Sequence, residues 1–156
     1  MVAIEHPVAE VWRWLGEIPD PEIPVLSILD LGIVRDVRWE DELVITITPT
    51  YSGCPAMDAI ASDIRAAAGR HGVEHLRLET MLSPPWSTDW MSEDAKARLR
   101  DYGIAPPELI SIASPVACPR CGSTETRVVS RFGSTPCKGL YKCLACLEPF
   151  DVFKRH

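Results

Sequence analysis

The sequence predicts an α/β protein in which a small mixed β-sheet with packed helices is followed by a small β zinc ribbon. Periodic hydrophobic residues predict the sheet and helices, and two cysteine pairs near the end of the chain predict the ribbon. A proline-containing stretch separates these two patterns. The expected domains are therefore residues 1–103 and 116–156, joined by a linker over 104–115.

Hydrophobic periodicity predicts the elements of the first domain. Helices are expected from Val8 to about residues 16–18, over 55–68, and between Ser92, a good N-cap, and Gly103. Alternating residues predict strands over 33–39, 43–48 and 76–82, of which the first two form a hairpin. A strand, a helix and a further strand imply a right-handed parallel crossover, so the sheet should contain both parallel and antiparallel pairs.

The last forty residues carry two C-x-x-C knuckles, Cys118/Cys121 and Cys143/Cys146, with 21 residues between them. Two residues between cysteines allow a tight turn to direct both sulfurs at one ion, and two such turns complete a tetrahedral thiolate site. Strands are expected over 124–132 and 150–153. A segment this small cannot bury enough apolar area to fold alone, so the metal would supply the missing stability. Zinc is the expected ion, and iron is the alternative.

Cys54 is the candidate functional thiol of the first domain. The preceding strand ends at Pro49, and Pro55 suits the first position of a helix. Cys54 is therefore expected at or beside the N-cap, where free backbone N–H groups and the positive end of the helix dipole favour thiolate over thiol. The alternative is that Cys54 is only a small buried apolar residue.

Three other residues are candidates for a supporting role. Asp20 and Glu22 lie in a rigid Asp-Pro-Glu-Ile-Pro segment, either as a carboxylate pair near the Cys54 turn or as solvated loop acids. Cys137 is outside both knuckles, and the adjacent Lys138 would modestly favour its thiolate. It could be a free thiol, an exchangeable ligand or an inert residue. It could form a two-thiol relay with Cys54 only if the ribbon folds back on the first domain.

The charge distribution favours protein partners. Residues 1–115 contain 9 Lys/Arg against 19 Asp/Glu, whereas residues 116–156 contain 7 against 3. Four thiolates on a divalent metal would reduce the +4 charge of the ribbon to about +2. An acidic body with a weakly basic appendage gives no strong footprint for nucleic acid.

Several classes of protein are not indicated by the sequence. No apolar run is long enough to cross a bilayer, and the first residues do not resemble a signal peptide, so a cytoplasmic protein without membrane contact is expected. In that compartment six cysteines favour metal or thiol chemistry over disulfides. There is no glycine-rich phosphate loop, no H-E-x-x-H and no G-x-S-x-G, so we do not expect an enzyme.

Segments 20–24, 29–34 and 48–55 resemble the MIP18 (DUF59) family, which is associated with iron–sulfur cluster assembly. This resemblance extends over about residues 8–103. Segments 85–90, 102–107 and 132–138, together with the ribbon, are similar to the PaaD (PaaJ) family, the small accessory proteins of the bacterial phenylacetyl-CoA oxygenase (epoxidase) system. The second resemblance spans nearly the whole chain.

The resemblance implies a MIP18-like fold and a role in phenylacetate catabolism. That role would be maturation of the oxygenase's iron–sulfur reductase or di-iron subunit, with Cys54 as a transient ligand to an iron–sulfur cluster or iron. The implied partners are those subunits and the iron–sulfur assembly machinery, and the sequence leaves a homodimer open. Two alternatives remain: a non-catalytic structural or regulatory subunit of the oxygenase, and a nucleic-acid-binding ribbon.

Overall fold

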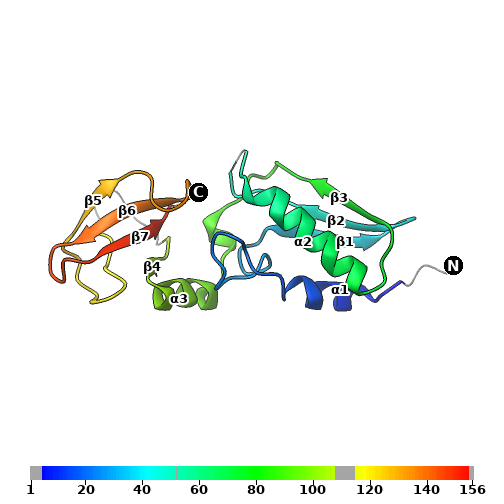
Figure 1. Cartoon of the computed structure of the whole chain (residues 1–156), viewed down its shortest axis with the longest axis horizontal. Helices are drawn as coiled ribbons and strands as arrows, with labels where there is room; N and C mark the ends of the chain where they lie inside the picture. Colours follow the sequence, from blue (N-terminus) through cyan, green and yellow to red (C-terminus); the bar gives the residue numbers. More distant parts are fainter. Residues whose placement is uncertain (1–4, 52, 108–114, 155–156) are drawn as a thin grey trace. The chain divides into compact units, whose positions relative to one another are not determined.

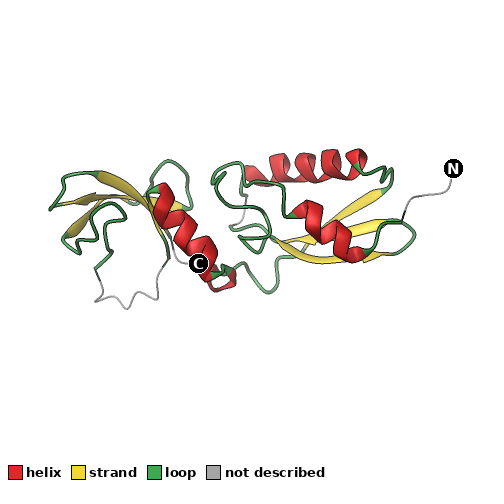
Figure 2. Cartoon of the chain, turned by 90° about the horizontal axis from the view of Figure 1, so that it is seen from below, coloured by secondary structure: helices red, strands yellow, loops and turns green. Residues whose placement is uncertain are grey.

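The computed structural model describes residues 5–51, 53–107 and 115–154, and the chain forms two compact units, Met1–Trp90 and Met91–His156 (Figures 1 and 2). Each unit has its own small sheet, and the predicted mixed α/β class is confirmed. The division lies earlier in the chain than the predicted domain end at residue 103. The helix between Ser92 and Gly103 consequently belongs to the second unit.

The first unit contains a three-stranded sheet with the order β1-β2-β3. Strands β1 and β2 are antiparallel, whereas β2 and β3 are parallel and joined through α2. The predicted hairpin and crossover are therefore both present. The elements are α1 (Val8–Leu15), β1 (Val34–Trp39), β2 (Leu43–Ile47), α2 (Ala56–Arg70), β3 (Leu76–Thr80) and the 3-10 helix η1 (Thr88–Trp90).

Helices α1 and α2 pack on one face of this sheet (Figures 1 and 2). All five residues of β2, the central strand, are buried. Trp14 of α1 is buried while Trp12 is only partly so, as expected for helical neighbours that point in different directions. The buried core also includes apolar residues from the loop before β1, among them Ile23, Leu26, Ile28, Leu31 and Ile33.

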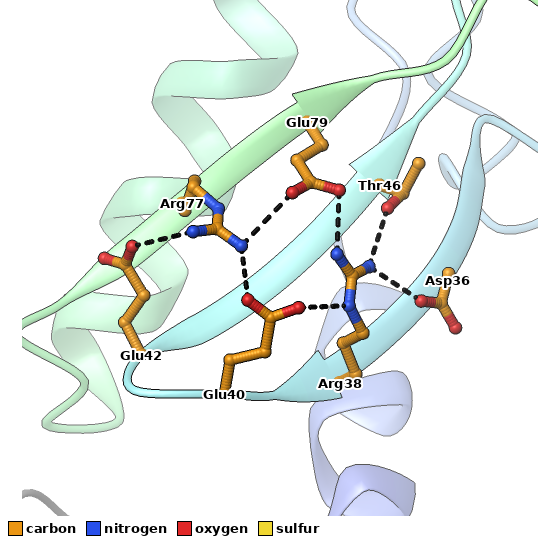
Figure 3. Close-up of polar contacts among 7 residues, drawn as sticks. All are labelled: Asp36, Arg38, Glu40, Glu42, Thr46, Arg77 and Glu79. Atoms are coloured by element: carbon orange, nitrogen blue, oxygen red, sulfur yellow. Dashed lines mark hydrogen bonds and ion pairs between the residues drawn. The ribbon is translucent and has the colours of Figure 1, made fainter.

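A network of ion pairs occupies the opposite face of the sheet (Figure 3). Arg38 donates to Asp36, Glu40 and Glu79 at 2.8–2.9 Å, and Arg77 links Glu40 to Glu79. The arginines and Glu79 come from the two edge strands, so the network crosses over β2, whose Thr46 hydroxyl also accepts from Arg38. Every arginine in this network is paired with carboxylates.

We expect this network to make the stability of the first unit pH-dependent in the acid range. Hydrogen bonds from Arg38 and then Arg77 lower the pKa of Glu40 from its usual 4.5. A carboxylate whose pKa is lower in the folded state contributes stability above its unfolded pKa, and loses it as the pH falls through the folded pKa. Urea unfolding followed by tryptophan fluorescence from pH 6 to pH 3 should therefore show a smaller loss of stability for Glu40→Gln than for wild type. Glu74→Gln, at an exposed position without an ion pair in the described structure, is the control and should follow wild type; equal slopes for Glu40→Gln and wild type would contradict the prediction.

The aromatic segment after β3 closes over the first unit. Trp86 is 4% exposed, and its indole N–H donates to the carbonyl of Leu31 at 2.6 Å. The Arg35 guanidinium lies 3.7 Å from the centre of the Trp90 ring, a cation–π contact. A Cβ at Gly32, which has a φ of +71°, would lie only 3.1 Å from the Trp90 side chain. The two tryptophans thus attach this segment to the loop before β1 and to the start of β1.

The second unit contains a four-stranded sheet with the order β4-β7-β6-β5. Strand β4 pairs in parallel with β7, and the other neighbours are antiparallel. The hydroxyl of Ser92 accepts the N–H of Ala95 at 3.0 Å, and Gly103, with a φ of +92°, ends the helix as expected. The elements are α3 (Glu93–Tyr102), β4 (Ile104–Ala105), β5 (Thr126–Ser130), β6 (Lys138–Cys143) and β7 (Pro149–Phe153).

The second unit differs from the sequence expectation in two places. Ile104–Ala105, expected in the linker, forms β4 and buries Ala105 in a core with Cys118, Cys143, Phe150 and Val152. Strand β6 was not expected, because Gly139 and the lysines at 138 and 142 obscure its alternation. Residues 108–114 of the expected linker lie outside the described residues.

Candidate metal centre and thiol site

The structure brings the sulfurs of Cys118, Cys121, Cys143 and Cys146 together, all within 4.8 Å of one another. The Sγ atoms of Cys118 and Cys146 are 3.8 Å apart, and those of Cys121 and Cys143 are 3.6 Å apart. Zn–S bonds of about 2.3 Å in a tetrahedron place sulfurs about 3.8 Å apart. These two distances match a tetrahedral thiolate site, and all four sulfurs lie close enough together to share one metal ion.

Each knuckle is shaped by backbone hydrogen bonds and one residue with a positive φ. In the first, the Gly122 N–H donates to the Cys118 carbonyl, and Gly122 has a φ of +76° that favours glycine. In the second, Leu147 has a φ of +67°, and the Cys146 N–H donates to the Cys143 sulfur at 3.4 Å. Such N–H groups stabilise negative charge on sulfur.

Hydrogen bonds and mutual proximity shift the pKa values of three of these thiols. The N–H groups of Cys146 and Ala145 lower the pKa of Cys143 to about 7. The pKa values of Cys121 and Cys146 are raised: although backbone N–H groups near Ser123 and Glu148 act in the opposite direction, neighbouring thiols and burial outweigh them. Four sulfurs at this distance cannot all be thiolates without a cation among them. This arrangement is a metal-binding centre of the zinc-ribbon type.

Cys54 directly precedes Pro55, which is the N-cap of α2, and the helix starts at Ala56. Gly53 has a φ of +74° and forms the turn before the cysteine, and the Cys54 carbonyl accepts the N–H of Met57 at 3.2 Å. Cys54 is 9% exposed. The thiol therefore lies at the positive end of a fifteen-residue helix, close to the surface but largely covered.

An open groove of about 420 Å³ between α2 and β3 reaches Cys54. Its walls are mostly apolar, and Leu82 after β3 is 64% exposed. Sequence reasoning missed this groove, although Leu78 and Leu82 stood in the predicted alternating pattern without an assigned partner. Its lining includes Gly53, Cys54, Met57, Asp58, Arg65, Leu78 and Leu82.

Asp20 and Glu22 do not line the groove in its described part. Asp20 is only 5% exposed, and its carboxylate accepts the backbone N–H groups of Glu22 and Ile23 at 2.9 and 2.8 Å. The Asp20 N–H donates to the Leu26 carbonyl, which closes the loop. Asp20 is thus a buried residue that holds this loop in shape, and not a solvated loop acid.

Cys137 is not one of the four clustered sulfurs. It is 3% exposed and lies just before β6, with its sulfur 3.0 Å from the hydroxyl of Thr135. Cys54 and Cys137 belong to different units. The supporting roles of Cys137, Asp20 and Glu22 remain predictions.

Two family profiles match the chain: one described as an iron–sulfur cluster assembly protein over residues 8–74, and one described as the PaaD zinc beta ribbon domain over residues 106–154. A protein of Escherichia coli (strain K12), named as one subunit of a "Putative 1,2-phenylacetyl-CoA epoxidase", is 51% identical over 152 residues, which cover 94% of this chain and 92% of that protein. The chain belongs to the PaaD family. Its order of domains, an assembly domain followed by a PaaD ribbon, agrees with the resemblance found in the sequence.

Other relatives resemble this PaaD family member over part of its length. An "Fe-S protein maturation auxiliary factor" of Porphyromonas gingivalis is 36% identical, covering 58% of this chain and 88% of that protein. A DUF59 domain from Bacillus anthracis has a TM-score of 0.55 and 32% identity, covering 59% of this chain and 90% of the other. A conserved hypothetical protein from Thermotoga maritima gives 0.52 and 27%, covering 65% and 97%. No helix within the described ranges is long and apolar enough to cross a membrane.

Proposed function

We propose that this protein is an accessory factor of the phenylacetyl-CoA epoxidase system that assists iron–sulfur cluster or iron assembly on a client subunit. The observation that carries the proposal is that Cys54 lines an open groove, in a chain that is 51% identical to a protein named as an epoxidase subunit. Shorter relatives named as maturation factors support the same chemistry. The clients would be the reductase or di-iron subunits, in the cytoplasm.

Cys54 would serve as a transient ligand to iron. A thiolate binds iron well, and Cys54 lies directly before the N-cap of α2 where an open groove reaches it. Because Cys54 is the one cysteine in the sequence of the first unit, that unit can supply one thiolate bond, and the iron must be shared with other ligands. Transfer then needs only ligand exchange: a client thiol gives its proton to water and binds the iron as a thiolate, while the Cys54–iron bond breaks and Cys54 leaves as a thiolate. No electron is moved in this exchange.

The four-cysteine centre would hold zinc for structure rather than for reaction. Four protein thiolates fill the tetrahedron and leave no open position for water or substrate, unlike a catalytic zinc site. Purified protein should therefore contain about one zinc per chain. Metal and sulfide analysis of anaerobically prepared wild type and Cys54→Ala would separate this zinc from any iron bound at Cys54. We infer that the protein is not itself an enzyme.

The test of the proposal compares two thiol variants in a strain lacking the gene. Cys54→Ala should reduce growth on phenylacetate and the iron and sulfide content of the purified epoxidase subunits, because the transient ligand is absent. Cys137→Ala, checked for folding by circular dichroism, is the matched thiol variant: full restoration of both would show that Cys137 is an inert buried residue, and partial restoration would give it a supporting role. Full cluster content with Cys54→Ala would refute the role of the thiol.

One alternative is supported by the name of the Escherichia coli relative, which makes it part of the epoxidase itself. A structural or regulatory subunit would remain bound to the epoxidase, and its thiols would be incidental. This alternative predicts co-purification with the catalytic subunits in a fixed ratio and normal iron content when the protein is absent. The deletion strain used above therefore distinguishes it from a maturation factor.

A further inference from the structure

Strand β5 has an exposed edge with an unusual composition. It is the last strand in the order β4-β7-β6-β5, so one side of its backbone has no partner strand in the described sheet. Val128, Val129 and Phe132 are 55%, 54% and 67% exposed. We call Arg127, Val128, Val129, Arg131 and Phe132 the β5 edge. By contrast, all five residues of the central strand β2 are buried.

The cations at and beside the β5 edge have no counter-charges among the residues that the structure describes. Arg127 lies directly opposite Lys142 of β6 in the antiparallel ladder, and like charges in that position repel each other. Arg127, Arg131 and Lys142 form no ion pair with any described residue. The arginines of the β1–β3 network are, in contrast, each bonded to several carboxylates (Figure 3). Carboxylates from another molecule would convert this repulsion into attraction.

We propose that the β5 edge binds an extended, acidic segment of a partner protein, which adds to the sheet as a further strand. The free backbone groups of β5 would provide the hydrogen bonds, as in other cases of strand addition. Because side chains alternate, the added strand could direct carboxylates toward Arg127 and Lys142 on one face and apolar side chains toward Val128 on the other. The view that this partner is the client of Cys54 rests on the proposed function, whereas binding itself does not.

The charges and side chains favour this occupant over two others. A second copy of the chain, paired edge to edge, would bring Arg127 and Arg131 close to the same cations of its twin. Single-stranded nucleic acid binds through stacked aromatic rings and cations together. Phe132 is the one ring of the β5 edge, and the Lys154 ammonium already lies 4.5 Å from its centre. Two exposed valines offer no stacking surface but suit an apolar strand.

The test is an NMR titration of the full-length, zinc-loaded protein with an octapeptide of alternating glutamate and valine. Saturable shifts should appear in the amides of β5 and weaken as salt is added, since the pairs are exposed. The variant Arg127→Glu/Arg131→Glu should lose affinity about tenfold. Arg70→Glu, at an exposed position on α2 in the first unit, is the control and should bind normally. A lysine–valine peptide should bind the double variant better than wild type.

Four results would overturn the proposal. Equal affinity of wild type for both peptides would show that charge does not determine binding. Unchanged NMR shifts of the β5 amides would show that the edge accepts no added strand, and that its cations only protect it from aggregation. Tighter binding of a single-stranded oligonucleotide at the same amides would indicate a nucleic-acid surface. Concentration-dependent dimers that exclude the peptide would indicate a second copy as the occupant.

The same variants separate this proposal from the proposed function. If the peptide binds but Cys54→Ala retains full client cluster content, strand binding at the β5 edge is supported and the maturation role of Cys54 is refuted. If the client subunits lose clusters with Cys54→Ala but the peptide does not bind, the maturation role is supported and strand binding at the β5 edge is refuted. When both hold, Arg127→Glu/Arg131→Glu should lower client cluster content with Cys54 intact; unchanged content would show that the client does not use this edge.

Discussion

Removing the metal from the four-cysteine centre is expected to unfold the whole second unit, including α3 and β4, while the first unit stays folded. Two ligands, Cys118 and Cys143, are themselves part of the buried core with Ala105, Phe150 and Val152. A core of this size cannot outweigh the chain entropy without the metal. Structural zinc contributes about 10–16 kcal/mol of apparent binding free energy in comparable small sites, so its loss exceeds the stability of such a unit.

The distribution of aromatic residues allows the two units to be followed separately. All five tryptophans lie between residues 12 and 90, and all three phenylalanines lie between 132 and 153. On addition of a strong chelator, tryptophan fluorescence should stay unchanged while the phenylalanine signals in NMR spectra collapse to random-coil positions. The ligand variant Cys118→Ala should behave like the chelated protein, and Cys137→Ala like wild type. Loss of both the tryptophan and the phenylalanine signals would show that the two units unfold cooperatively as one. If α3 stayed folded in the chelated protein, the helix would not depend on the ribbon.

Local patterns in the sequence predicted those parts of the fold that depend on neighbouring residues. Alternation identified β1, β2 and β3, and the serine cap and Gly103 marked both ends of α3. The two knuckles identified the four sulfurs, because the spacing of cysteines within a turn determines where their side chains point. The position of Cys54 beside the first turn of α2 was likewise set by the prolines on either side of a short turn.

Features that depend on distant partners could not be read from the sequence. Ile104–Ala105 becomes a strand only because β7, more than forty residues later, pairs with it, so the second unit begins before α3. The carboxylate of Asp20 caps backbone N–H groups within its own loop, a role that the residue type alone does not separate from a solvated acid. The groove at Cys54 requires that β3 be an edge strand partly uncovered by α2, which is a tertiary property.

Truncation of the α2 core should have the second largest effect and should be confined to the first unit. Ile64 is fully buried where α2 packs on the sheet, and Ile64→Ala is expected to lower the free energy of unfolding by about 2–5 kcal/mol, through lost burial and the cavity left behind. Tryptophan fluorescence during urea unfolding measures this loss. The adjacent Asp63→Ala, at an exposed position, should stay within about 0.5 kcal/mol of wild type.

Ile64→Ala also distinguishes the stability of the first unit from the role of the Cys54 sulfur. Because α2 holds Cys54 at its first turn, Ile64→Ala should abolish client maturation only at temperatures where the first unit unfolds, and leave it intact below them. Cys54→Ala should do the reverse, with little change in unfolding and loss of maturation at every temperature. If both variants lost maturation at every temperature, the function would depend on the shape of α2 rather than on the Cys54 sulfur. If Ile64→Ala unfolded like wild type, α2 would not be packed on the sheet as observed.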